Sequence, residues 1–220
     1  MVRQLEAVIF DLDGVITDSA HFHYLAWKQL AADIDIEIDE AFNETLKGIS
    51  RMDSLDLILA KGGREKDFTL EQKEELAAKK NAHYVELLKD LSPADILPGI
   101  KPLLDAIRAA NLKIALASVS KNAPMVLAAL GLTDSFDYLA DAAKITHSKP
   151  NPEIFLVAAA GLSVEPANAV GIEDAQAGVE AIKSAGMKAI GVGTGLIGTD
   201  ELVSDTSKLT LAMIQKVFQI

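Results

Sequence analysis

The pattern of hydrophobic and polar positions divides the chain into an α/β part and a helical part. Residues 7–10 are four consecutive apolar residues, which predict a strand buried on both faces. Between about residues 20 and 91, apolar positions recur at helical spacing, with no convincing strand. After residue 92, short apolar runs alternate with helical patterns. This order predicts an α/β fold: a parallel, Rossmann-like sheet flanked by helices, with an all-helical domain inserted after the first strand.

The domain boundaries follow from these changes of period. Residues 1–17 and 92–220 are expected to form the α/β core, and residues 18–91 the inserted helical domain. Inside the insert, Thr69 and Gln72 have the spacing of a capping box, as do Ser50 and Asp53. Residues 33–38 alternate between acidic residues and isoleucine, which fits a strand or a turn, and we favour the turn. Expected helices are 20–34, 41–46, 50–60, 69–90, 100–110, 123–130, 152–160, 175–185 and 209–218; expected strands are 7–10, 113–117, 138–140, 169–172 and 188–192.

Composition narrows the class of protein. The chain has 220 residues, half of them apolar, which is enough for one good core with a smaller domain beside it. It has no cysteine, so disulfides and thiolate metal sites are excluded. The N-terminus has no signal-peptide pattern and no apolar run reaches membrane-spanning length, so we expect a cytoplasmic protein. We also expect a monomer. The net charge of −11 argues against nucleic acid and anionic membranes as partners.

Polar residues that could form a functional site follow the ends of the predicted strands. Asp11 and Asp13 follow the first strand directly. The pair alone is weak evidence for a site, because Asp33-x-Asp35 has the same spacing. In an open α/β sheet the carboxyl ends of the strands form one ligand-binding edge. Several carboxylates, a hydroxyl and a lysine there fit a Mg²⁺ site beside a phosphate. The other polar groups at this edge are Ser118, Ser120, Lys121, Asn122, Lys149, Glu173 and Asp174.

In combination these residues resemble the haloacid dehalogenase superfamily of phosphotransferases. The superfamily's four motifs match Asp11-x-Asp13, Ser118, Lys149-Pro150 and Glu173-Asp174 in order. A helical cap inserted after the first motif is the superfamily's first cap class, so the resemblance covers the whole chain. The chain is more closely similar to the β-phosphoglucomutase family, through FDLDGVITD at 10–18, LKGISR at 46–51, LASVSKN at 116–122 and GIED at 171–174.

The resemblance implies a role for each core residue. Asp11 would be the nucleophile that accepts a phosphoryl group, and Asp13 the general acid and base. Ser118 and Lys149 would balance charge on the transferring group, and the Lys149–Pro150 bond would be cis. The implied Mg²⁺ ligands are the carboxylates of Asp11, Glu173 and Asp174 and the backbone carbonyl of Asp13.

For the cap, the resemblance implies substrate discrimination. Arg51 would bind the phosphate that is not transferred, together with core residues from Ser120 to Asn122. The helix face that carries Ser19, His23 and Trp27 at i, i+4 and i+8 would meet the sugar. The cap residues His23 and Lys80 would be linked to the placement of Asp13. Further implied contacts are Lys47, Gly48, Ser54 and Val119, the last replacing a smaller residue usual in the family.

Ordinary structural explanations compete with these roles. Asp174 can cap the following helix, and Arg51, Lys47 and Lys80 can be surface charges. His21 and His23 diverge on a helix, so they do not form a metal pair. Residues 193–198 spell a dinucleotide-binding fingerprint, but too little chain follows to supply the required helix and acidic strand. A glycine-rich turn is the better interpretation of that segment.

The resemblance implies an isomerase that interconverts β-D-glucose 1-phosphate and glucose 6-phosphate. The expected route uses an aspartyl phosphate at Asp11, Mg²⁺, and glucose 1,6-bisphosphate as the activating intermediate. The alternative is a Mg²⁺-dependent sugar-phosphate phosphatase, which shares every core motif. A third possibility, a non-catalytic phosphate-binding protein, would require a damaged motif, and none is found. A related sugar phosphate as the substrate stays open.

Overall fold

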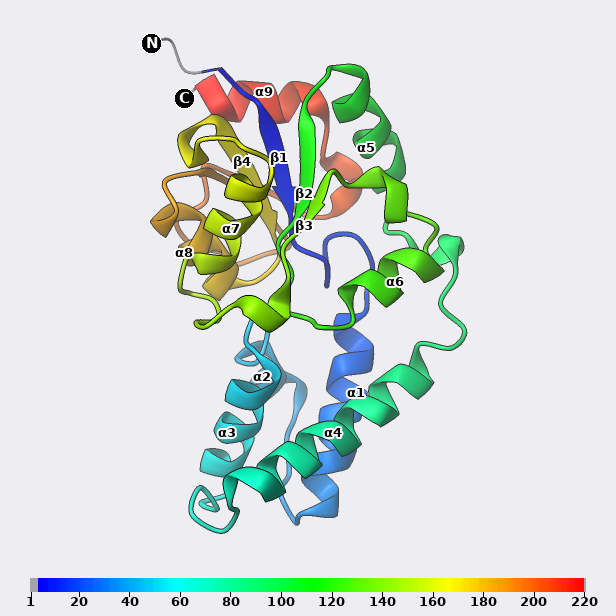
Figure 1. The fold of residues 1–220 in the computed structure, drawn as a ribbon, viewed down its shortest axis with the longest axis vertical. Helices are drawn as coiled ribbons and strands as arrows, with labels where there is room; N and C mark the ends of the chain where they lie inside the picture. The colour runs from blue at the N-terminus through cyan, green and yellow to red at the C-terminus, as the bar shows by residue number, and fades with distance from the viewer. Residues whose placement is uncertain (1–3, 220) are drawn as a thin grey trace. The chain divides into compact units, whose positions relative to one another are not determined.

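The computed structural model describes residues 4–219, and the chain divides into two compact units (Figure 1). One unit, called here the α/β unit, combines Met1–Asp18 with Leu91–Ile220. The other, the helical unit, is Ser19–Asp90. The boundaries expected from the sequence lie one residue away from these.

The α/β unit is built on one six-stranded sheet in the order β3-β2-β1-β4-β5-β6, with every neighbouring pair parallel. This confirms the predicted fold class. Because the first strand of the chain lies in the middle of the sheet, its carboxyl end is flanked by those of β2 and β4. The strands are β1 (Ala7–Phe10), β2 (Lys113–Leu116), β3 (Tyr138–Leu139), β4 (Ala169–Glu173), β5 (Lys188–Val192) and β6 (Glu201–Val203).

The prediction of loop followed by helix after residue 193 was wrong in one respect, because β6 lies between them. β6 has only three residues and pairs on one side only, with β5. A strand this short carries no readable period of two. The glycine-rich loop itself is confirmed: Gly193 and Gly195 have positive φ angles of 113° and 79°, and no helix opens at Gly198.

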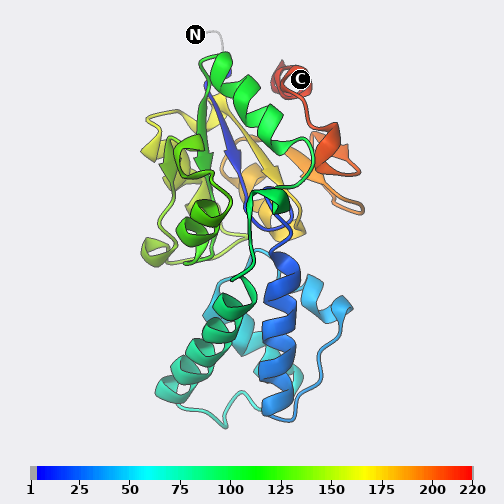
Figure 2. The same cartoon turned by 90° about the vertical axis from the view of Figure 1, so that its right-hand side faces the viewer.

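Helices cover both faces of the sheet, as Figures 1 and 2 show. Ala7 and Ile9 of β1 belong to a buried cluster with Phe155 and Ile182 of the helices α7 and α8. The helices α5 and α9 pack against strands of the sheet and against each other. The remaining helix, α6, follows β2. These helices are α5 (Ile100–Ala109), α6 (Ala123–Ala129), α7 (Glu153–Gly161), α8 (Gln176–Ser184) and α9 (Leu211–Gln219).

The helical unit has a hydrophobic core of its own. Trp27, Leu30 and Leu55 are buried in it, and α1 packs along α4 (Figure 2). Asp33 ends α1, and residues 34–38 form a turn and an irregular segment, as favoured from the sequence; the three isoleucines of this segment are buried in this core. The Thr69–Gln72 capping box is present. The helices are α1 (Ala20–Asp33), α2 (Glu40–Glu44), α3 (Arg51–Lys61) and α4 (Leu70–Leu87).

The two chain segments that lead out of the α/β unit are tied together within it. Thr17 is buried, and its hydroxyl donates to the carbonyl of Asp95 at 2.8 Å. The Leu97 N–H donates to the carbonyl of Ile16 at 2.9 Å.

Across residues 4–219, no helix is long and apolar enough to cross a membrane.

Candidate active site

The parallel register of three central strands brings the first functional residues to one edge of the sheet. Phe10, the last residue of β1, is level with Leu116 of β2 and Ile172 of β4. The ladder continues one step further, because the Asp11 N–H donates to the Ile172 carbonyl at 3.0 Å. Asp11, Ser118 and Glu173 therefore leave neighbouring strands at the same edge, as expected from the sequence.

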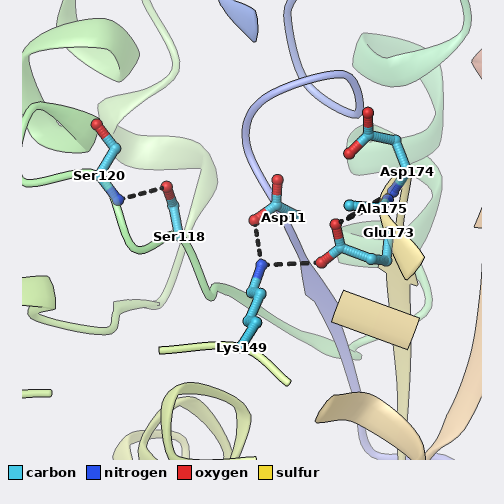
Figure 3. Close-up of polar contacts among 7 residues, drawn as sticks. All are labelled: Asp11, Ser118, Ser120, Lys149, Glu173, Asp174 and Ala175. Atoms are coloured by element: carbon cyan, nitrogen blue, oxygen red, sulfur yellow. Dashed lines mark hydrogen bonds and ion pairs between the residues drawn. The ribbon is translucent and has the colours of Figure 1, made fainter. Parts of the chain in front are cut away.

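Lys149 joins two of the carboxylates at this edge (Figure 3). Its ammonium donates to Oδ1 of Asp11 at 2.5 Å and to Oε2 of Glu173 at 2.8 Å. All three side chains are buried, with Lys149 1% and Glu173 0% exposed. A lone lysine in a loop carried no signal by itself, so its burial between two carboxylates is decided by the fold. The Lys149–Pro150 bond is cis, as predicted.

Burial and charge oppose each other in this cluster. Burial alone would lower the pKa of Lys149, but the charges and hydrogen bonds of Asp11 and Glu173 outweigh it and raise that pKa above its ordinary value. Burial raises the pKa of Glu173, the charge of Asp11 adds to the rise, and Lys149 opposes it. Lys149 therefore stays protonated, and Glu173 holds a proton more readily than a free carboxyl group does, because it is buried beside another carboxylate.

Asp174 completes an acidic group beside Lys149. Ligand oxygens of Asp11, Glu173 and Asp174 lie within 4.8 Å of one another. Oε1 of Glu173 also accepts the backbone N–H groups of Asp174 and Ala175, each at 3.2 Å, which fixes its carboxylate. The three carboxylates fit a hard divalent cation such as Mg²⁺.

Two glycines make room for these carboxylates. A Cβ at Gly14 would overlap the carboxylate of Asp174, and Gly14 has a positive φ angle of 78°. A Cβ at Gly178, on α8, would overlap the carboxylate of Glu173. The glycine after Asp13 therefore serves both the turn and the acidic group.

The loop after β2 is built around serine hydroxyls. Oγ of Ser118 accepts the N–H of Ser120 at 3.1 Å, and Oγ of Ser120 accepts the N–H of Asn122 at 3.3 Å. Ser118 is buried, whereas Lys121 is exposed. Val119 packs partly against the core cluster between the sheet and α7. Asp13 is partly buried, and its backbone forms an isolated parallel β-bridge with that of Thr17 after β1.

In the helical unit, a second group forms around Lys80. Its ammonium lies 2.6 Å from Nδ1 of His23, 4.6 Å from the ring centroid of Trp27 and 5.0 Å from that of Tyr84. The rings of His23 and Tyr84 are stacked, with centroids 3.9 Å apart. Burial lowers the pKa of His23 far below its ordinary value, and the charges of Lys80 and Arg51 lower it further. His23 is therefore a neutral imidazole whose Nδ1 accepts from Lys80.

The other cap residues are placed as follows. An Arg51 guanidinium N–H donates to Oδ1 of Asn81 at 2.7 Å, and burial lowers the pKa of Arg51. Lys47 pairs with Glu44 at 3.0 Å. Gly48, in the loop before α3, has a positive φ angle. The side chains of Ser19, Ser54, Trp27 and Lys80 are buried in the unit.

Sequence reasoning missed Tyr84 and Asn81. Tyr84 lies four residues after Lys80, and therefore on the same face of α4. Asn81 lies next to Lys80, and its partner Arg51 is thirty residues away in the chain. The helical spacing was a signal for Tyr84, but no local signal existed for Asn81.

Known proteins resemble the chain over nearly its whole length. It is 50% identical to the β-phosphoglucomutase of Bacillus subtilis (strain 168), over 98% of this chain and 96% of that one. It is 31% identical to a phosphorylated carbohydrates phosphatase of Thermotoga maritima, over 84% of each chain. A crystal structure of β-phosphoglucomutase from Clostridium difficile matches with a TM-score of 0.97 and 50% identity, covering 98% of both chains.

The family model of haloacid dehalogenase-like hydrolases matches residues 5–186, which include the whole helical unit, a large part of the α/β unit and all four core motifs. The acidic group and the buried lysine lie within this match, whereas β5 and β6 lie beyond its end. The chain belongs to the haloacid dehalogenase-like hydrolase family.

Proposed function

We propose that this protein is a β-phosphoglucomutase that interconverts β-D-glucose 1-phosphate and D-glucose 6-phosphate. The observation that carries the proposal is the 50% identity to the Bacillus subtilis enzyme, because it extends over 98% of the chain and so includes the helical unit. Family membership by itself does not separate a mutase from a phosphatase, because the chain is also 31% identical to the Thermotoga maritima phosphatase over 84% of its length.

Asp11 is the proposed phosphoryl acceptor. In the phosphorylated enzyme, the 6-hydroxyl of β-glucose 1-phosphate attacks the phosphorus on Asp11, the bond to the Asp11 oxygen breaks, and the hydroxyl proton goes to Asp13. The resulting bisphosphate binds again in the opposite orientation. An Asp11 oxygen then attacks the 1-phosphate, the bond to the sugar oxygen breaks, and Asp13 returns the proton to that oxygen.

Lys149 makes this attack electrostatically feasible. A carboxylate that approaches a phosphate is repelled by it, and Lys149 places an ammonium 2.5 Å from the attacking side chain. Together with Ser118 it would balance charge on the transferring group. The proposed Mg²⁺ ligands are Asp11, Glu173 and Asp174, with the Asp13 carbonyl. The three carboxylates and one ammonium have a formal charge of −2, which a divalent cation neutralises; when bound, Mg²⁺ would stabilise the negative charge of the phosphoryl group.

The helical unit is proposed to discriminate between substrates. Arg51 and Lys47 would bind the phosphate that is not transferred, assisted by Ser120, Lys121 and Asn122 of the α/β unit. The remaining proposed contacts with the sugar phosphate are Ser19, His23, Trp27, Gly48, Ser54, Lys80 and Val119.

The test measures product and free phosphate in one reaction. The enzyme is given β-glucose 1-phosphate, Mg²⁺ and a catalytic amount of β-glucose 1,6-bisphosphate, and glucose 6-phosphate and inorganic phosphate are quantified over time. A mutase forms glucose 6-phosphate with little phosphate released. If phosphate release equals or exceeds glucose 6-phosphate formation, the mutase proposal fails and the protein is a sugar-phosphate phosphatase.

A further inference from the structure

The loop that carries Lys149 joins an exposed stretch of backbone to a buried charge. Thr146, His147, Pro150 and Asn151 are exposed, whereas Lys149 between them is 1% exposed. Its ammonium must nevertheless meet two carboxylates at 2.5 and 2.8 Å. An irregular loop places a side chain this accurately only when its backbone is held by other groups.

Glu153, the first residue of α7, holds the loop on the N-terminal side of Lys149. Its Oε1 accepts the Thr146 N–H at 2.9 Å, and its Oε2 accepts the His147 N–H at 2.8 Å. Nδ1 of His147 also lies 3.1 Å from Oε2. One carboxylate therefore fixes two successive peptide groups that end two residues before Lys149.

The C-terminal side of Lys149 is tied to the same residue. The Glu153 N–H donates to Oδ1 of Asn151 at 3.0 Å, and the Asn151 N–H donates to the Ser148 carbonyl at 3.0 Å. The segment 146–153 is thus closed by hydrogen bonds on both sides of Lys149. The backbone hydrogen bonds from Thr146 and His147 hold the pKa of Glu153 below its ordinary value, so the carboxylate is charged at neutral pH.

We infer that Glu153 is a positioning residue for the reaction: it fixes the loop so that the Lys149 ammonium reaches Asp11 and Glu173. This inference rests on the role of Lys149 in the proposed function. Glu153 acts through the backbone of the loop. The competing explanation is that Glu153 only stabilises the start of α7.

The test compares Glu153→Gln and Glu153→Asp with a control, Asp141→Asn. Glutamine keeps one acceptor oxygen, so it can hold only one of the two N–H groups well. Aspartate keeps both oxygens and the charge. Asp141 also accepts a backbone N–H in the same stretch of chain, that of Ala143 at 3.0 Å, and caps a short helix outside the loop.

For Glu153→Gln we expect kcat to fall about tenfold with KM within about twofold of wild type, because misplacing Lys149 weakens the transition state more than binding. The Thr146 and His147 amide protons should exchange faster with solvent, as measured by NMR. Glu153→Asp should recover kcat to within about threefold, and Asp141→Asn should match wild type. A lower melting temperature with unchanged kcat, measured well below melting, would overturn the inference in favour of the structural role.

Hydrolysis of p-nitrophenyl phosphate, measured on the same variants, separates this inference from the proposed function. If wild type forms no glucose 6-phosphate but Glu153→Gln still lowers hydrolysis about tenfold, the mutase proposal fails and the positioning role stands. If wild type is a mutase and Glu153→Gln keeps full kcat in both reactions, only the positioning role fails. If wild type has neither activity, both fail.

Discussion

Each unit buries one lysine, and the two lysines have different neighbours. Lys149, 1% exposed, lies between the carboxylates of Asp11 and Glu173. Lys80, 2% exposed, donates to the imidazole of His23 and lies near the faces of two aromatic rings. Burying an ammonium is costly unless nearby groups compensate for lost water. The α/β unit supplies opposite charge, and the helical unit supplies a nitrogen lone pair and ring faces.

The pKa shifts show what this difference does. The carboxylates hold the pKa of Lys149 above its ordinary value despite burial. In the helical unit, burial lowers the pKa of His23 well below its ordinary value, and the nearby cations lower it further. The α/β unit therefore stabilises the charged form of its buried lysine, whereas the helical unit keeps an imidazole neutral beside a cation. The predictions below test this contrast, from the largest expected effect to the smallest.

Asp11→Asn tests the charge on which the α/β site depends. Asparagine has nearly the same shape but no anionic oxygen to accept a phosphoryl group, so kcat should fall by at least about 10⁴-fold. Mass spectrometry should find no phosphorylated protein after incubation with β-glucose 1,6-bisphosphate. The melting temperature should stay close to that of wild type. Retained turnover would show that another residue is the nucleophile.

Lys149→Met removes the ammonium and leaves two buried carboxylates without it. We expect the free energy of unfolding to fall by about 3–5 kcal/mol, because uncompensated buried charge is strongly destabilising. Urea denaturation measures it. Lys101→Met is the control, since Lys101 is 64% exposed and lies 3.9 Å from Asp105 in a surface pair. Equal stability of both variants would mean that the buried cluster does not need its lysine.

Arg51→Ala tests discrimination by the helical unit. Loss of a guanidinium that binds the second phosphate should lower kcat/KM for β-glucose 1-phosphate by about 100-fold. Hydrolysis of p-nitrophenyl phosphate, which has one phosphate, should change little. Arg64→Ala is the matched control, because Arg64 belongs to the same unit and pairs with Asp67. An equal loss in both reactions would assign Arg51 a structural role.

The neutral state of His23 predicts a pH dependence of stability. The folded pKa lies below the unfolded value of 6.5, so the unfolded chain binds more protons as pH falls below 6.5. This term should reduce the stability of the protein from about pH 6.5 downward, with a slope of at most about 1.4 kcal/mol per pH unit. Chemical denaturation at several pH values measures it. His23→Gln should remove this component, and an unchanged slope would refute the neutral imidazole.

The sequence by itself determined the α/β fold class, the helical insert and the order of the core motifs. It did so because strand period, helix spacing and capping residues act over a few neighbours, as at Thr69 and Gln72. It missed β6, because a three-residue edge strand depends on pairing with β5 more than on its own pattern.

Only the tertiary structure decided which polar side chains meet. Lys149 is 138 residues from Asp11 in sequence, and Arg51 is 30 residues from Asn81, so neither contact leaves a local pattern. The protonation states of Lys149 and His23 likewise depend on burial and on the charges that the fold brings near them. The order of chemical groups along the chain is a property of the sequence. The distances between charged groups and the local dielectric, which set their interaction energies, exist only after folding.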